Sequence, residues 1–438
     1  MQASQRAEWN HALEYAIFWA NELKKPLLAF FGLTESFPEA NSRHFRFLLE
    51  GLRETEAKLS RRGIQMIAIH GDPCEGVLRF SKEAALVVTD YGYLRIQREW
   101  RQKVAEVLPC ALVAVESDVI VPVSLALPRE AYSARILRPA LRKRLSRFLT
   151  PLQENPLHFP SLSLPKPFDA LDLSQPEHIL SSLRTESIPP VRFKQGGTER
   201  AKERLREFIE GKLSTYAFSR NDPGVDGLSG MSPYLHFGQI SPLFIALEVL
   251  RAEVPETHKE TYLEELIVRR ELSMNFTFYN SQYDSFAALP RWAQETLRKH
   301  RNDPRPYTYT LEELENARTH DPLWNAAQKE LLLSGTIHGY VRMYWGKKIL
   351  EWSKDPEEAF VAACYLNNKY ALDGRDPNSF AGIAWCFGKH DRPFRERPVY
   401  GKVRPMTRGA PSSASKKAYI ERVEKLANLL GGEKSALP

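Results

Sequence analysis

Residues 26–69 read PLLAFFGLTESFPEANSRHFRFLLEGLRETEAKLSRRGIQMIAI, and this stretch decides the fold of the first part of the chain. Its two apolar ends, 26–31 and 64–69, have the length and composition of buried strands. The segment between them repeats apolar residues at helical spacing as far as Gly63. Strand, helix and strand at this spacing are typical of a parallel sheet covered by helices.

The pattern continues beyond this stretch. ALVVTD (85–90) and ALVAVE (111–116) read as further strands, and HGDP (70–73) fits an Asp helix cap followed by Pro at the first helical position. No GxGxxG follows any strand, so the dinucleotide-binding fingerprint is absent. We therefore expect a Rossmann-like α/β domain over residues 1–132.

The middle of the chain has a different character. Residues 133–149 are basic, and we expect Pro139 to break or kink their helix. Eight of the 30 prolines fall between 151 and 190, without sustained periodicity. This composition is typical of an extended linker. Residues 133–190 are thus predicted to form a basic segment and an interdomain linker.

From residue 191 onward, strand signals vanish and helical patterns take over. We predict an all-α domain over 191–438, with one short strand pair around 397–406 that turns at Gly401 and Lys402. The predicted helices are 196–213, 239–252, 258–280, 290–301, 310–316, 322–334, 337–353 and 356–369.

Composition narrows the class of protein. Of the 438 residues, 43% are apolar and 26% charged, and no apolar run approaches the roughly 18 residues of a membrane span. The start, MQASQRAEWNHALEYA, lacks the order of a signal peptide. These features predict a cytoplasmic protein that does not bind membranes. The four cysteines form no CxxC pair, which favours buried thiols over a zinc site or disulfides.

Basic charge is concentrated near the C-terminus. The net charge is +7, and the stretch 386–417 holds nine Lys or Arg residues against Asp391 and Glu396. Aromatic residues, including Phe394, are interleaved with these cations, and Trp385 directly precedes the stretch. Cations for phosphates and flat rings for bases are what nucleic-acid binding requires. A solvated charged tail is the alternative.

Two polar segments are candidates for ligand binding. LSGMS (228–232) offers backbone N–H groups and hydroxyls at an expected helix start, which suits phosphate, although a plain helix cap would look the same. Residues 367–385, NNKYALDGRDPNSFAGIAW, place four amide and carboxylate side chains in one turn: Asn367, Asp373, Asp376 and Asn378. They could cap helices, bind a heterocycle and ribose, or hold a metal, although the calcium-loop spacing does not match.

One predicted helix is unusually aromatic and basic. HGYVRMYWGKKILEW (338–352) places Trp345 and Trp352 seven residues apart, hence on one face, and Trp324 lies in the preceding helix. Such a stripe can be plain core. It can also be a relay of oxidisable rings leading from a buried redox cofactor to the surface, with Lys347 and Lys348 on the solvent side.

Four blocks together resemble the class II photolyases, which repair cyclobutane pyrimidine dimers. They are LSGMSPYLHFGQIS (228–241), LEELIVRREL (263–272), THDPLWNAAQKELLLSGTIHGYVRMYWGKKILEW (319–352) and LDGRDPNSFAGIAWCFGKHDRPF (372–394). The resemblance covers essentially the whole chain. It implies a fully reduced FAD in the helical domain, which blue light excites to donate one electron to a flipped-out dimer in UV-damaged DNA. The electron then returns, so this is a lyase reaction without net oxidation.

The same resemblance leaves room for a second, antenna chromophore of the deazaflavin or pterin type. It also implies a monomer without an obligate protein partner.

The resemblance assigns roles to individual residues. The residues expected to hold FAD are Tyr216, Leu228, Ser229, Gly230, Met231, Ser232, Arg270, Arg342, Trp345, Asn367, Asp373, Asp376 and Asn378. Arg342 and Asp373 would form an ion pair beside the flavin, and Asn367 would stand near flavin N5. Trp345, Trp324 and Trp352 would be the proximal, middle and outer relay members.

A second group would contact damaged DNA. Glu265 would hydrogen-bond the flipped bases, Met343 would touch them and Trp385 would stack on them. Arg220, Arg392 and Arg395 would contact phosphates, and Arg404 would fill the space left in the duplex.

The chain departs from the family pattern in two places. Arg269 stands where some relatives carry a stacking Trp. The chain also starts almost at its first helix, where relatives begin with a strand, so we expect a gap in the sheet beside residues 27–31 and a weakened first domain. Either translation begins late, or Met1 is internal to a longer reading frame.

Three rival functions stay in view. They are a cryptochrome-like photoreceptor without repair activity, a (6-4) photoproduct repair enzyme, and a nucleic-acid-binding module without catalysis.

Overall fold

The computed structural model describes residues 1–406 and 411–432. Contacts between residues group the chain into two compact units that alternate along the sequence. The first unit comprises Met1–Pro128, Ala140–Glu207 and Gly230–Glu253. The second comprises Arg129–Pro139, Phe208–Ser229 and the chain from Val254 onward. Within the described residues, no helix is both long and apolar enough to span a bilayer.

The first unit holds the four predicted strands. β1 (Leu28–Leu33) pairs in parallel with β2 (Gln65–His70), and β3 (Leu86–Asp90) pairs in parallel with β4 (Ala111–Val115). Each strand lies within two residues of its predicted bounds, so the α/β prediction is confirmed.

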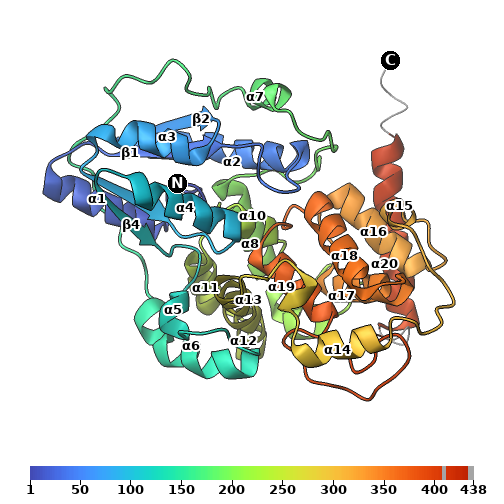
Figure 1. The fold of residues 1–438 in the computed structure, drawn as a ribbon. Coiled ribbons are helices and arrows are strands. Elements are labelled where there is room, and N and C mark those ends of the chain that lie inside the picture. Colours follow the sequence, from blue (N-terminus) through green and yellow to red (C-terminus); the bar gives the residue numbers. More distant parts are fainter. Residues whose placement is uncertain (407–410, 433–438) are drawn as a thin grey trace. The chain divides into compact units, whose positions relative to one another are not determined.

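Helices pack on these strands as the strand–helix–strand pattern predicts. α1 (His11–Leu23) contacts β3, α2 (Ser42–Arg61) contacts β2, and α3 (Pro73–Phe80) contacts β1 (Figure 1). α4 (Arg95–Val107) packs against α3. Asp72 caps α3 through the backbone N–H of Cys74, and Pro73 is its first residue. The cap predicted from HGDP is therefore confirmed.

The expected gap in the sheet is present. The two strand pairs are separate sheets, so β1 and β3 share no backbone hydrogen bonds. A cavity of about 760 Å³ is lined by residues of both strands, by α1 and by Met1 and Gln2.

Residues 1–4 connect the two half-sheets. The Gln2 side chain exchanges hydrogen bonds with the backbone of Gly32 in β1. One carboxylate oxygen of Asp90, at the end of β3, accepts the backbone N–H groups of Gln2, Ala3 and Ser4 at 2.7–2.8 Å. The Asp90 carboxylate therefore accepts hydrogen bonds from the backbone of this segment, as the carbonyl groups of a neighbouring strand would in a continuous sheet.

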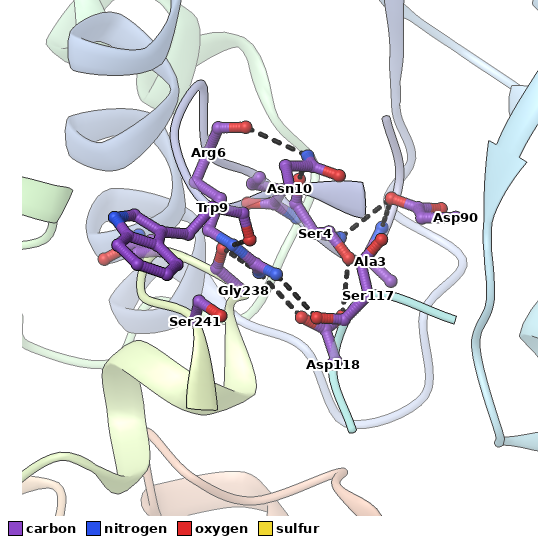
Figure 2. A network of polar contacts seen from close by, with 12 residues as sticks. Ala3, Ser4, Arg6, Trp9, Asn10, Asp90, Ser117, Asp118, Gly238 and Ser241 are labelled. Carbon is purple, nitrogen blue, oxygen red and sulfur yellow. Dashed lines mark hydrogen bonds and ion pairs between the residues drawn. The ribbon is translucent and has the colours of Figure 1, made fainter. Parts of the chain in front are cut away.

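A buried ion pair reinforces this corner of the first unit. The Arg6 guanidinium is fully buried and donates to the Asp118 carboxylate at 2.7 Å and to the carbonyls of Ser117 and Gly238 (Figure 2). A charge buried in this way is stable only because its donors have acceptors.

The basic segment and the linker follow the first sheet region. The short helix α5 (Val123–Ala126) precedes α6 (Ala134–Phe148), which contains Pro139 in its interior. Of the two effects expected of Pro139, a break is wrong, because one helix runs through it, and a kink stays a prediction. Proline removes only the bond to the Arg135 carbonyl, and Arg135 is exposed, so water can replace the lost donor.

Residues 151–190 run along the first unit with one short helix, α7 (Pro176–Ser182). The Ser161 hydroxyl donates to the Leu27 carbonyl at 2.6 Å, and Ala170 forms an isolated bridge with Ile69.

Helices are the main elements in the rest of the described residues, as predicted. The first unit adds α10 (Ser232–His236) and α11 (Pro242–Arg251), and α8 (Thr198–Gly211) runs from it into the second unit. The remaining helices are α9 (Tyr216–Ser219), α12 (Glu256–Leu263), α13 (Arg270–Tyr279), α14 (Arg291–Lys299), α15 (Leu311–Glu315), α16 (Pro322–Ser334), α17 (Gly339–Trp352), α18 (Pro356–Tyr370), α19 (Pro377–Cys386) and α20 (Ser413–Gly432). A π-helical turn, η3 (Glu264–Arg269), joins α12 to α13.

Within the second unit, α17 packs against α16, α18 and α19, and α20 packs on α16 (Figure 1). The strand pair predicted around 397–406 is wrong. A single antiparallel bridge joins Arg397 to Gly401, and the chain turns through Pro398, Val399 and Tyr400 rather than at Gly401 and Lys402.

Candidate functional site

Asn367 lies at the centre of the second unit and is fully buried in α18. Its amide nitrogen donates to the Ser379 hydroxyl at 2.7 Å, and that hydroxyl donates in turn to the Asn368 side-chain oxygen at 2.7 Å. Because the Ser379 proton is committed to Asn368, Ser379 can only accept from Asn367. This chain of bonds fixes the amide orientation and leaves the Asn367 Oδ1 atom without a partner among the described residues.

Arg342 on α17 offers the complementary group. Its Nη2 atom contacts both carboxylate oxygens of Asp373, at 3.0 and 3.1 Å, so the predicted ion pair is confirmed. Both bonds use one nitrogen, and the buried Nε atom has no hydrogen-bond partner within the described chain. Buried polar groups are normally paired, so one open acceptor and one open donor on packed helices indicate a ligand.

These two open groups fit a reduced flavin. Its N5–H is a donor that suits the Asn367 oxygen, and its ring carbonyls are acceptors that suit a guanidinium. The chemistry of these two residues therefore fits the predicted FAD site, and their contact with the cofactor stays a prediction.

Asp376 and Asn378 begin α19. The Asp376 carboxylate accepts the backbone N–H and the side-chain amide of Asn378, both at 2.8 Å. The helix-capping interpretation of these residues is confirmed, and their contact with a cofactor stays a prediction.

Tyr216 opens α9 and is buried against the rings of Phe208 and Tyr262, with centroids 5.6 and 5.2 Å away. Burial raises the pKa of Tyr216 well above its ordinary value and the pKa of Tyr262 to about 12, so both stay neutral. The Tyr262 hydroxyl lies 3.3 Å from that of Ser229, which follows Leu228 in the phosphate-binding candidate.

The segment LSGMS crosses between the two units. Leu228 and Ser229 belong to the second unit, whereas Gly230, Met231 and Ser232 belong to the first. Gly230 has a positive φ of 71°, and Ser232 is the first residue of α10, so the predicted helix start is confirmed. Arg270 is the first residue of α13 and is buried.

The three predicted relay tryptophans form a continuous row in the second unit. The rings of Trp345 and Trp324 are stacked within 6° of parallel with centroids 6.3 Å apart, and Trp324 meets Trp352 edge-on at 5.6 Å. Both spacings fall in the range of directly interacting aromatic pairs. The indole nitrogen of Trp345 donates to Gln328 at 2.9 Å, and that of Trp324 donates to the Trp345 carbonyl at 3.0 Å.

The lysines of α17 are not on its solvent side, contrary to the expectation. Lys347 is buried and donates to the Cys386 carbonyl at 2.8 Å, and burial lowers its pKa to about 8. Lys348 is buried between the rings of Tyr344 and Trp352 and pairs with Glu351 at 2.6 Å. Their long aliphatic stems allow this burial because each ammonium group still finds an acceptor.

The residues assigned to the dimer also lie in the second unit. Glu265 belongs to η3 and accepts a hydrogen bond from Arg220 at 2.8 Å, so two residues predicted for DNA are paired with each other. The Arg269 guanidinium lies 5.3 Å from the centre of the Trp385 ring, so Arg269 covers the face expected to stack on the lesion. Met343 contacts Cys386 through its carbonyl and its sulfur.

The C-terminal cations surround Phe394. The guanidinium groups of Arg392 and Arg404 lie 5.8 and 5.7 Å from its ring centre, and Arg395 follows it in the chain. Residues 407–410 of the basic stretch, among them Arg408, lie outside the described residues.

Sequence reasoning missed two residues that position the site. Ser379 orients Asn367, and Gln328 holds Trp345. Gln328 lies four residues after Trp324 in α16, so the shared helix face was a usable signal. Ser379 meets Asn367 from another helix, and no spacing indicates that contact.

Comparisons with known proteins identify the family of the chain. A family model described as DNA photolyase matches residues 1–157. The deoxyribodipyrimidine photo-lyase of Methanothermobacter thermautotrophicus is 51% identical over 432 residues, which are 97% of this chain and 94% of that protein.

Solved structures show the same fold at low identity. A cryptochrome from Synechocystis aligns with 98% of this chain and 89% of its own, with a TM-score of 0.75 and 15% identity. A photolyase from Sulfolobus tokodaii, solved with two FAD molecules, aligns with 100% and 95%, with a TM-score of 0.69 and 16% identity. These likenesses establish the fold, and the 51% identity along nearly the full length of both chains establishes the family. The chain therefore belongs to the DNA photolyase family.

Proposed function

We propose that this DNA photolyase repairs pyrimidine dimers in UV-damaged DNA under blue light, with a reduced FAD held in its second unit. The observation that carries the proposal is the pair of open polar groups, Asn367 Oδ1 and Arg342 Nε, which are among the few buried side-chain atoms of the described residues without a hydrogen-bond partner. When bound and reduced, FAD supplies the electron that light transfers to the dimer and recovers it after the cyclobutane ring has opened.

The protein's part is to hold and tune the cofactor. Asn367 is neutral, so its oxygen can accept a hydrogen bond from the flavin without placing a negative charge beside it. Asp373 keeps the Arg342 guanidinium in place, and the second edge of that guanidinium stays available to the ligand. Full burial of Asn367 excludes water from its surroundings.

The dimer side of the proposal rests on Glu265 and Trp385. Glu265 is paired with Arg220, so binding of flipped bases requires the carboxylate to exchange this partner for base N–H groups. Arg220 is then released toward a phosphate. Trp385 supplies a flat face, and Arg269 must move from that face before a dimer can stack there.

A second chromophore in the first unit is a further part of the proposal. The Sulfolobus tokodaii photolyase was solved with two FAD molecules, which implicate a novel light-harvesting cofactor in that protein. For this chain we propose a deazaflavin or pterin antenna. Mass spectrometry of small molecules released from the purified protein, combined with an action spectrum for repair, tests this point.

The relatives support repair rather than a cryptochrome-like role, because the relative at 51% identity is named for dimer cleavage. We also propose that the protein acts as a cytoplasmic monomer without an obligate partner, which sedimentation of the purified holoenzyme tests.

One assay decides the main proposal. Purified protein is reduced with dithionite and mixed with UV-irradiated oligothymidine, and dimers are counted after blue light and after darkness. We expect loss of dimers only in light, and strongly reduced loss for Glu265→Ala. Repair in darkness, or no repair by flavin-loaded and reduced protein in light, would overturn the proposal.

A further inference from the structure

A closed turn, residues 396–401, separates two cations that are predicted to contact DNA. Arg395 precedes the turn, Arg404 follows it, and both side chains are exposed. Arg397 and Gly401 exchange backbone hydrogen bonds at 3.0 and 2.9 Å, which close the turn. The spacing of the two cations therefore depends on what holds this turn in place.

The turn is strained at Val399. This residue has a φ of 66°, which a β-branched side chain rarely adopts. Its backbone N–H donates to one carboxylate oxygen of Asp303 at 2.8 Å, and the Tyr400 hydroxyl donates to Glu351 at 2.7 Å. Strain of this kind persists only where the surroundings hold it. The bond to Asp303 is therefore part of what keeps the turn in its shape.

His300 connects this support to the start of the turn. It follows α14 directly, and its Nδ1 atom lies 2.6 Å from the Asp303 oxygen that accepts from Val399. Its Nε2 atom lies 2.9 Å from Glu396, the first residue of the turn. Ionised carboxylates only accept hydrogen bonds, so both ring nitrogens must carry protons to satisfy the two contacts. The geometry thus requires the imidazolium form, and the C-terminal end of α14 favours a cation there.

The charges around His300 agree with this form. Glu396 also pairs with Lys299 at 2.8 Å, and the Asp303 carbonyl accepts from Arg305 at 2.9 Å. Hydrogen bonds to Glu396 and Asp303 raise the pKa of His300 above its ordinary value of 6.5. Hydrogen bonds from Lys299 and His300 lower the pKa of Glu396 to about 2, and the bonds that Asp303 accepts lower its pKa as well. Both carboxylates therefore stay ionised near neutral pH, and His300 is the group that titrates.

We propose that the His300 imidazolium positions the 396–401 turn for DNA binding by bridging Asp303 and Glu396, and that the protein holds damaged DNA less tightly once this imidazolium loses its proton. This inference rests on the proposed function and on the predicted contact of the cations beside the turn with DNA. A neutral imidazole has one N–H, so it can keep a hydrogen bond to one carboxylate only. Its lone pair then faces the other carboxylate, and the turn loses one of its ties. His300 acts through the turn and is a positioning residue.

Binding of DNA in darkness tests this bridge without repair. The holoenzyme is titrated with fluorescently labelled, UV-irradiated oligothymidine at several pH values from about 6 to 9, and the fluorescence anisotropy gives Kd. We expect Kd to rise roughly tenfold as His300 loses its proton, which corresponds to the loss of one hydrogen bond to a charged group. His300→Asn can replace only the Nδ1 donor, so it should bind weakly at every pH and show no step. His178→Asn changes an exposed histidine of α7 in the first unit and should keep the step.

Lys347 also titrates in this range, because burial lowers its pKa to about 8. The titration is therefore repeated with Lys347→Met, which should keep the step in Kd. If the step disappears in Lys347→Met and persists in His300→Asn, it belongs to Lys347, and the role of His300 is overturned.

The outcomes separate this inference from the proposed function. If the flavin-loaded and reduced protein binds irradiated DNA no more tightly than undamaged DNA at any pH, the proposed function is wrong and the inference falls with it. If the unmodified protein binds irradiated DNA with one Kd across the whole pH range, only the positioning role of His300 is overturned. The same holds if His300→Asn binds as tightly as the unmodified protein at the lowest pH.

The protonation state of His300 can be measured without DNA. Nitrogen resonances of isotopically labelled histidine should show that His300 titrates above 6.5, with both ring nitrogens protonated below its pKa. Glu396→Gln should move this titration to lower pH, because it removes one of the two negative charges. Titration of His300 at or below 6.5 in the unmodified protein would overturn the bridge.

Discussion

The amide nitrogen of Asn367 donates to the Ser379 hydroxyl across 2.7 Å, and this bond determines which atom of Asn367 is left for the proposed flavin. Since Ser379 donates onward to Asn368, the amide cannot turn round without breaking two hydrogen bonds. The orientation of a buried acceptor is thereby set from a second helix, which makes Ser379 a direct test of the flavin site.

Ser379→Ala should weaken FAD binding. Loss of one orienting hydrogen bond costs roughly 1–2 kcal/mol, which is about tenfold in Kd. Fluorescence titration of cofactor-free protein with FAD measures the change. Ser285→Ala, which removes an exposed loop hydroxyl bonded to the Gln282 carbonyl, is the control and should leave Kd unchanged. Equal Kd values for both variants would show that Ser379 does not orient the site.

Asp373→Asn should destabilise the second unit and weaken FAD binding. The Arg342 and Asp373 side chains are only 20% and 11% exposed, and removing one partner of such a pair costs roughly 3–5 kcal/mol. Glu312→Gln breaks the exposed pair with Arg318 and should cost about 0–1 kcal/mol. Urea unfolding of the two variants compares these costs, and similar values for both would contradict the structural role of the buried pair.

Trp324→Phe should abolish reduction of bound FAD by blue light in the presence of a thiol. Trp324 alone bridges the rings of Trp345 and Trp352 in the observed row, and phenylalanine is much harder to oxidise. Trp292→Phe changes a tryptophan of α14 whose indole bonds to Tyr132, and it should photoreduce normally. The flavin absorbance recorded during illumination gives the rate, and equal rates in the two variants would refute the row as a relay.

Because of Lys347, the free energy of unfolding should rise with pH between about 8 and 10.5. Its pKa is lowered by burial from 10.5 to about 8 in the folded protein. Below pH 8 both folded and unfolded states are protonated, and the folded state bears the full cost of the buried charge. Between 8 and 10.5 the unfolded state binds more protons, so the free energy of unfolding increases, and above 10.5 the gain is complete.

The total effect is up to about 3 kcal/mol, since each pKa unit corresponds to about 1.4 kcal/mol. Lys347→Met should remove this pH dependence. Urea unfolding of both proteins at several pH values from 7 to 10 measures the difference, and a constant difference across that range would contradict the assignment.

Local signals in the sequence predicted the elements well. The strand at 85–90, the Asp72 cap and the helix at 322–334 each depend on residues adjacent in the chain, and each is present. Pro139 and the segment 397–406 were misjudged for a related reason. A proline near an exposed helix start costs little, and the turn at Val399 depends on distant partners such as Asp303, which accepts its backbone N–H.

Contacts across the second unit were harder to foresee. The burial of Lys348 depends on Glu351 and on two rings, and the pairing of Tyr309 with His320 joins two loops separated by α15. Family resemblance could supply the identity of Asn367 as a site residue. The contact with Ser379 that orients it could not be predicted, because it joins two helices and no spacing in the sequence indicates it.

The π-helical turn η3 also makes this part of the chain sensitive to the deletion of a single residue. Such a turn holds one residue more than the α-helix that it interrupts, and each residue of an α-helix turns the chain by about 100°. Deleting a single residue between 264 and 269 would restore regular hydrogen bonding, yet it would rotate Glu265 away from its present bearing relative to Arg269. In an alignment of homologues, a one-residue gap at this point would mark a chain in which Glu265 no longer has its present orientation relative to Arg269, even where both side chains persist.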